Sequence, residues 1–114
     1  EEQMAFESTA KIQLVDGPTE ASKTIIFNDE DHTLGNALRF MMMRESQTSF
    51  CGYSMPHPSE TRVQMRVQTR GEPAVEVTGR ALGKLATAAD TIRERFTAAV
   101  AAKAAAEGSS SSSA

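Results

Sequence analysis

Few side chains in this sequence could take part in catalysis. Cys51 is the single cysteine, and His32 and His57 are the two histidines. A Cys–His pair is a common nucleophile, but Cys51 lies in an alternating apolar stretch, where a small buried thiol is inert. His57 stands between two prolines in an expected loop, and nothing in the sequence directs it toward a nucleophile. The sequence therefore predicts no catalytic site.

An acidic run followed by a histidine, Asp29 to His32, has the residue types of a metal site. Neighbouring side chains on an extended segment point in different directions, and no second cluster supplies the missing ligands. A helix cap explains the run better, with Asp31 or Thr33 accepting from the amides of the first turn. Residues 79–85 (GRALGKL) also fall short of a phosphate-binding loop, because one residue is missing between the glycines and Leu85 replaces the hydroxyl. We expect no metal, phosphate group or cofactor.

The expected helix after this cap has one apolar face. Its apolar residues recur at i, i+3, i+4, i+7 and i+8, and they are Leu34, Ala37, Leu38, Met41 and Met42. Three successive residues, 41–43, are methionines and cannot all face the same side. Methionine suits both cores and protein-binding surfaces, so both interpretations stay open for the triplet.

Three stretches, at 11–15, 50–55 and 62–70, alternate between apolar and polar residues and predict strands. Residues 23–28 (KTIIFN), bounded by the acidic run at 29–31, predict a fourth strand. Residues 74–77 are expected to extend the sheet beyond a turn at 70–73. With the helices, this order predicts an α+β fold, a small antiparallel sheet with two helices on one side.

The last predicted element is a long helix over residues 78–107, on the order of 45 Å in length. Its apolar residues alternate in spacing between three and four, and they are Leu82, Leu85, Ala89, Ile92, Phe96 and Ala99. The simpler interpretation is that these apolar residues are buried against the chain's own sheet. The helix is much longer than strands of roughly 20 Å, so we expect part of this seam to contact another chain.

Composition limits the class of protein further. The chain has 114 residues, enough for one domain. A net charge of −3 gives no general attraction for nucleic acid or anionic membranes, and no apolar run approaches the ~20 residues of a membrane span. Leu, Ile, Val and Phe together number 20, a small supply that favours a core completed by a partner. We expect an acidic arm with a short strand at 1–22, a domain at 23–107 and a serine-rich tail at 108–114.

Three motifs occur in order along the chain: residues 30–39 (EDHTLGNALR), 50–60 (FCGYSMPHPSE) and 66–71 (RVQTRG). Together they resemble the small alpha-like subunits of multisubunit RNA polymerases. Residues 37–39, 50–53 and 59–60 are most similar to the subunit shared by eukaryotic RNA polymerases I and III.

This resemblance implies the dimerisation fold of the bacterial alpha subunit and a non-catalytic role. It implies an obligate heterodimer with a larger alpha-like subunit, which forms the platform for the large catalytic subunits, in the nucleus including the nucleolus. No direct sequence-specific binding of nucleic acid and no membrane contact is expected. The implied partner interface consists of Leu34, Leu38, Met41, Met42, Leu82, Leu85, Ala89, Ile92 and Phe96. The implied signature, expected to shape the strand-to-helix turn and to dock polymerase neighbours, consists of Asp31, His32, Thr33, Gly35, Asn36, Gly52, Tyr53, Pro56, His57 and Pro58.

Other functions stay open from the residues alone. The chain could be the equivalent subunit of RNA polymerase II or of an archaeal polymerase. A free-standing homodimeric module would use the same helix pair symmetrically. A small-molecule enzyme would need a polar pocket with converging titratable groups, and the sequence supplies no such set.

Overall fold

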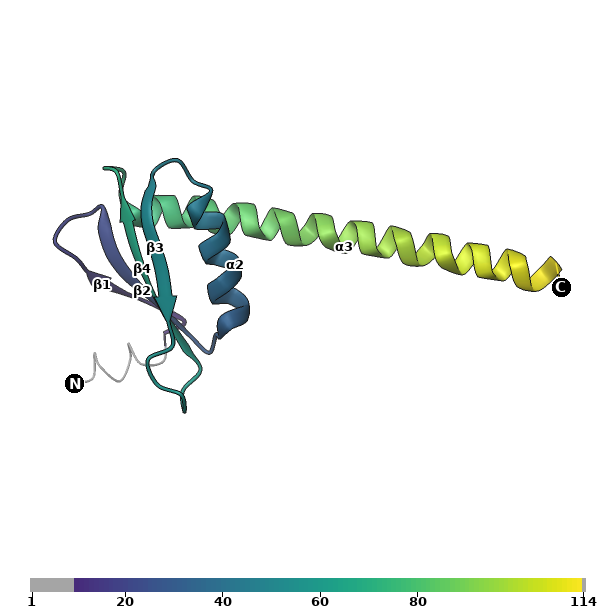
Figure 1. The fold of residues 1–114 in the computed structure, drawn as a ribbon, viewed down its shortest axis with the longest axis horizontal. Coiled ribbons are helices and arrows are strands. Elements are labelled where there is room, and N and C mark those ends of the chain that lie inside the picture. The colour runs from purple at the N-terminus through teal and green to yellow at the C-terminus, as the bar shows by residue number, and fades with distance from the viewer. Residues whose placement is uncertain (1–9, 114) are drawn as a thin grey trace.

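The computed structural model describes residues 10–113, with side chains described through residue 108. Along the chain the elements are β1 (Ile12–Asp16), β2 (Ser22–Asn28), α2 (His32–Met43), β3 (Thr48–Ser54), β4 (Arg62–Thr69) and α3 (Ala74–Ser113). Figure 1 shows a small sheet with α2 beside it and α3 extending far beyond it. The predicted arm at residues 1–9 lies outside the described residues, and the predicted strand that follows it is β1.

The four strands form one antiparallel sheet in the order β1-β2-β4-β3, as predicted in class. In the clearest strand, β4, Val63, Met65 and Val67 are fully buried while Gln64 and Arg66 are exposed. A period of two places alternate residues on opposite faces. One face of the sheet therefore carries the core and the other is open.

The turn from β2 to α2 is set by two aspartates. Asp29 has a φ of 61°, a left-handed conformation that aspartate tolerates better than most residues, and its amide donates to the Thr61 carbonyl at 2.8 Å. Asp31 then caps α2, because its carboxylate accepts from the Thr33 amide at 2.9 Å. These amide contacts hold the pKa of Asp31 below its usual range. The predicted cap is confirmed.

The start of α3 corrects the sequence prediction. Residues 74–77 were expected in the sheet, but they form the first turn of α3. Pro73 has no amide to continue a ladder, and its carbonyl accepts from the amides of Glu76 and Val77 instead. Ala74 and Val77, three residues apart, are then both buried on one helical face.

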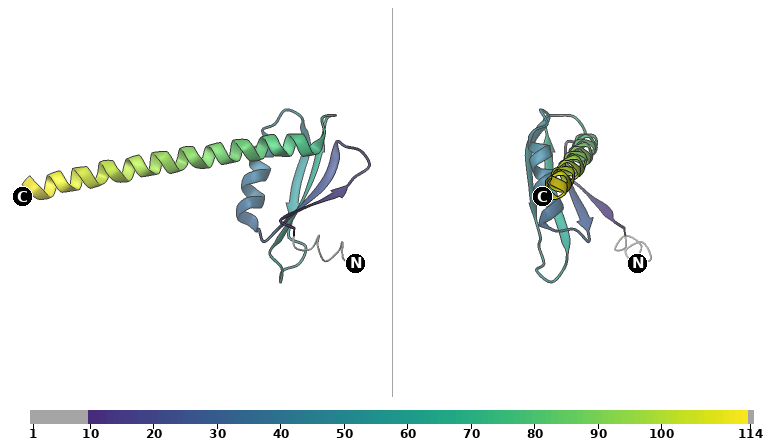
Figure 2. Two further views of the ribbon diagram at one scale, coloured as in Figure 1. Left: turned by 180° about the vertical axis from the view of Figure 1, so that it is seen from behind. Right: turned by 90° about the vertical axis from the view of Figure 1, so that its right-hand side faces the viewer.

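α3 has 40 residues, or about 60 Å at 1.5 Å per residue. It continues to Ser113, whereas the sequence predicted an end at residue 107. Each added residue gains one hydrogen bond once a helix exists, so propagation is easier than initiation. From Ala89 to Gly108 every residue is exposed, and Figure 2 shows this part projecting away from the sheet.

The core lies between the sheet and the helices. α2 packs mainly on β3, and the first turns of α3 lie over β4 and β2. The core is formed by Ile25, Phe27, Leu38, Met42, Cys51, Val63, Met65, Val67, Ala74, Val77 and Ala81. None of the helices in the described part of the chain has the length and hydrophobicity of a transmembrane span.

Candidate partner-binding surface

Cys51 and His57, the residues considered above as a reactive pair, do not lie in a catalytic arrangement. Cys51 is buried in β3, and this burial raises the pKa of its thiol to about 11, which keeps it protonated near neutral pH. His57 is exposed in the loop between β3 and β4. Among residues 10–113, no three His, Cys, Asp or Glu side chains converge as metal ligands do.

The first turn of α2 is built against Tyr53 of β3. His32 Nδ1 lies 2.9 Å from the Tyr53 hydroxyl, and the two rings meet edge to face with centroids 5.6 Å apart. A Cβ on Gly35 would lie 2.7 Å from the Tyr53 ring, closer than real atoms approach. The structure therefore brings Asp31, His32, Gly35 and Tyr53 together as a turn that seats α2 on the sheet.

The remaining signature residues are spread over other surfaces. Gly52 lies beneath the Phe50 ring, where an added Cβ would be 3.1 Å from that ring. Asn36 is exposed and lines the recess between the helices. The loop residues Pro56, His57 and Pro58 are exposed. Their predicted docking to neighbouring subunits stays a prediction.

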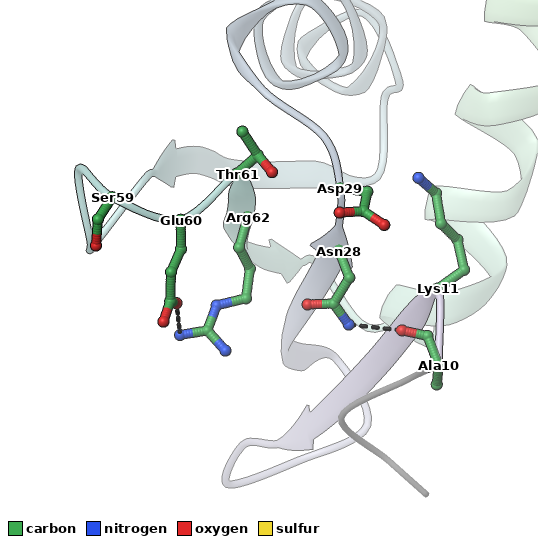
Figure 3. Close-up of a pocket in the computed structure, with 8 residues that line it drawn as sticks. All are labelled: Ala10, Lys11, Asn28, Asp29, Ser59, Glu60, Thr61 and Arg62. Atoms are coloured by element: carbon green, nitrogen blue, oxygen red, sulfur yellow. Dashed lines mark hydrogen bonds and ion pairs between the residues drawn. The ribbon is translucent and has the colours of Figure 1, made fainter. Parts of the chain in front are cut away.

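A polar recess of 720 Å³ lies where the start of β1, the end of β2 and the β3–β4 loop meet (Figure 3). Asn28 Nδ2 donates to the Ala10 carbonyl at 2.6 Å, and Glu60 pairs with Arg62 at 3.1 Å. Ser59 lies on the opposite side of the recess from Asn28 and Asp29. The Asp29 amide, which donates to the Thr61 carbonyl at 2.8 Å, ties the loop to the end of β2.

The second recess is apolar and lies between the two helices. This α2–α3 groove has a volume of 400 Å³. It is lined by Asn36, Ala37, Arg39, Phe40, Met41, Leu85, Ala88, Ala89 and Ile92. Ile92, at the end of the groove, is 68% exposed, and beyond it Phe96 is 68% and Val100 49% exposed. An apolar strip therefore leaves the globular part of the chain and continues along α3.

The predicted interface residues divide into three sets by their exposure. Leu34, Met41, Leu82 and Leu85 are half-buried around the core, while Ala89, Ile92 and Phe96 are exposed on α3. Leu38 and Met42 are different, because both have no exposed area and form part of the chain's own core. They support α2 from behind, and the surface defined below leaves them out.

Sequence reasoning missed Phe40 and Val100. Phe40 is 57% exposed on α2, with the Arg44 guanidinium 5.4 Å from the centre of its ring. A bulky aromatic outside the apolar row of its helix was the available signal. Val100 lies four residues after Phe96 and so on the same side of α3, but the predicted seam ended on its neighbour Ala99.

A buried carboxylate fixes the angle between the helices. Glu45, just after α2, is buried and accepts from Arg80 at 3.1 Å, while Lys84 Nζ lies 2.7 Å from its second oxygen. Arg80 also makes two hydrogen bonds to Glu72, of 2.6 and 3.1 Å. The hydrogen bonds from Lys84 and Arg80 hold the pKa of Glu45 below its usual range. We call Glu45, Glu72, Arg80 and Lys84 the ionic clamp.

This arrangement defines a class of protein: a small α+β domain whose helix pair carries an exposed apolar surface. The sequence model of the RNA polymerase Rpb3/Rpb11 dimerisation domain matches residues 22–95. The chain belongs to this family, which confirms the predicted resemblance.

Individual relatives agree with this assignment. The chain is 44% identical over 84 residues to a zebrafish (Danio rerio) protein named DNA-directed RNA polymerases I and III subunit RPAC2, covering 73% of this chain and 75% of the relative. It is 41% identical over 98 residues to the Schizosaccharomyces pombe protein of the same name, covering 82% and 78%. RNA polymerase subunit L of Thermoplasma acidophilum superposes with a TM-score of 0.65 at 20% identity, over 75% of this chain and 84% of that one, which shows the shared fold.

Proposed function

We propose that this chain is the small alpha-like subunit of RNA polymerases I and III. It is a non-catalytic subunit, it forms a heterodimer with a larger alpha-like subunit, and the pair supports assembly of the large catalytic subunits in the nucleus, including the nucleolus. The names of the relatives and the match to the dimerisation-domain family support this role. The contact surface that we propose consists of the α2–α3 groove and the exposed row Ile92, Phe96 and Val100 of α3.

One observation carries the proposal: the exposed apolar row on a helix that no other part of the described chain, residues 10–113, covers. Burying a large aliphatic or aromatic side chain contributes about 1.5–3 kcal/mol. Ile92 and Phe96 each leave about two thirds of their area in water. A contiguous apolar surface of this kind marks an interaction site, and a partner helix along α3 would bury it.

The test is affinity purification of the tagged chain from its own cells, with mass spectrometry of the stoichiometric partners. We expect a larger alpha-like subunit together with the large subunits of polymerases I and III. Recovery of polymerase II subunits would keep the family and overturn the choice of polymerase. Recovery of the chain alone would favour a homodimer.

A matched pair of variants tests the surface itself. Phe96→Asp places a charge in the apolar row and should abolish co-purification of the larger subunit. Ala101→Asp adds the same charge five residues further on, on the opposite side of α3, and should leave co-purification intact. Equal recovery with both variants would contradict the proposed surface.

A further inference from the structure

A second apolar groove lies on the other flank of α3, between its first turns and β1. Ile12 and Leu14 of β1 form one wall, Val75 and Leu82 of α3 form the other, and the core residues Ile25 and Phe27 form the floor. We call it the β1–α3 groove. Its volume is 190 Å³.

The order of the strands leaves this groove open. β1 is at the edge of the sheet, next to β2, while α2 lies over β3 and α3 over β4 and β2. Ile12 and Leu14 pair with Phe27 and Ile25, so they face the helix side of the sheet, at a place that neither α2 nor α3 covers. As a result Ile12, Leu14 and Val75 are 48%, 53% and 44% exposed.

The chemistry of the groove selects an apolar occupant. Only Thr78 among the lining residues has a polar side-chain atom, and its hydroxyl already donates to the Ala74 carbonyl at 2.8 Å. Small-molecule pockets usually have volumes of roughly 300–1,000 Å³ and several polar anchors. This groove is smaller, and its shape and lining suit one or two aliphatic or aromatic side chains of another protein.

The position of the groove identifies the source of those side chains. Leu82 lines the β1–α3 groove, and Leu85, three residues later, lines the α2–α3 groove. The two grooves therefore flank the same turn of α3. The family match begins at residue 22, so Ile12 and Leu14 lie outside the matched dimerisation segment.

We propose that the larger alpha-like partner also inserts apolar side chains into the β1–α3 groove, so that the heterodimer encloses α3 from both flanks. This inference rests on the proposed function. It adds a strand outside the matched family segment to the contact surface.

Neighbouring residues of β1 provide a matched test, in the full chain combined with its larger partner. Leu14→Lys places a charge in the groove. Val15→Lys places the same charge one residue on, at a site of similar exposure (47%) that faces the opposite side of the sheet. We expect Leu14→Lys to weaken binding at least about tenfold and Val15→Lys to change it less than about threefold. Equal affinities of the two variants would overturn the inference.

A labelling experiment does not depend on an affinity change. Leu14→Cys introduces a reactive thiol into a chain whose own Cys51 is buried and protonated. We expect a thiol reagent to modify Leu14→Cys in the free chain and to be blocked in the heterodimer, while Val15→Cys is modified in both. Modification of Leu14→Cys at equal rates in both states would overturn the inference. Protection that grows with the concentration of the free chain would also overturn it, because a second copy would then occupy the groove.

The Phe96→Asp variant separates this inference from the proposed function. If Phe96→Asp abolishes the heterodimer but Leu14→Lys does not weaken it, the inference fails and the function stands. If Phe96→Asp binds normally, the proposed surface fails and this inference fails with it.

Discussion

At the scale of single residues, two glycines in helices have opposite roles. Gly35 lies against the Tyr53 ring, where an added Cβ would be 2.7 Å from its carbons, whereas Gly83 of α3 has nothing within 4 Å of an added Cβ. Gly35→Ala should therefore destabilise the chain by about 1–3 kcal/mol through overpacking. Gly83→Ala should stabilise it by up to about 1 kcal/mol through helix propensity. Urea unfolding of both variants measures these changes, and a stabilising Gly35→Ala would contradict the packing described for α2.

The structure places Leu38 in the core of the chain. Its position on the apolar face of α2 suggested a partner contact, but it has no exposed area. Leu38→Ala should cost about 2–5 kcal/mol of the free energy of unfolding of the isolated chain. Ile92→Ala, at a 68% exposed site, should change that free energy by less than about 0.5 kcal/mol. If thermal unfolding of the free chain showed similar losses for both, the assignment of Leu38 to the core would be wrong.

At the scale of elements, the ionic clamp joins the end of α2 to the start of α3. The pKa of Glu45 lies below its ordinary value of 4.5 in the folded chain, because Lys84 and Arg80 favour the carboxylate. A lowered folded pKa means that the stabilisation is present above pH 4.5 and is lost as the pH falls through the folded pKa. Glu45→Gln should therefore reduce stability at neutral pH and flatten the loss of stability below about pH 4.5.

The measurement for this prediction is the unfolding midpoint as a function of pH. Glu76→Gln, at an exposed site outside the clamp, serves as the control and should keep the wild-type pH profile. If Glu45→Gln lost stability below pH 4.5 as steeply as the wild type, other carboxylates would account for the acid sensitivity.

The elements also show which parts of the fold can be predicted from the sequence alone. The sequence predicted all four strands to within two residues, three of them from period-two alternation. The Asp31 cap was predictable from local chemistry. The start of α3 was not predictable in this way, because Ala74 and Val77 are residue types that suit either a buried strand or a buried helix. The helical hydrogen bonds to the Pro73 carbonyl distinguish the two, and they are visible only in the structure. Leu38 and Ile92 show the same limit for the site: both lie on apolar faces, and periodicity does not distinguish a core face from an interface.

At the scale of the whole molecule, the two ends of α3 have different stability. Its first turns contribute Ala74, Val77 and Ala81 to the core, but every residue from Ala89 to Gly108 is exposed. A helix without tertiary contacts is marginally stable in water, and its amides open at low cost. In the isolated chain we therefore expect amide hydrogens beyond residue 89 to exchange fast, and those of residues 74–85 to exchange slowly.

In the heterodimer the boundary of protection should move along α3 to Val100 and stop there. Ile92 at the end of the groove, and Phe96 and Val100 beyond it, are the large apolar side chains of this part of α3. Residues 101–107 (AAKAAAE) offer only alanines and an internal ion pair, Lys103 to Glu107 at 3.1 Å. Burial stabilises a helix where there is large apolar area to remove from water, so protection should fall within about one turn after Val100. Hydrogen exchange of the purified heterodimer, compared with the free chain, measures that boundary. Protection extending evenly to residue 108 would mean that the alanine-rich segment contacts the partner closely, as small residues allow. Protection ending at Ile92, before Phe96, would mean that the partner binds only the α2–α3 groove.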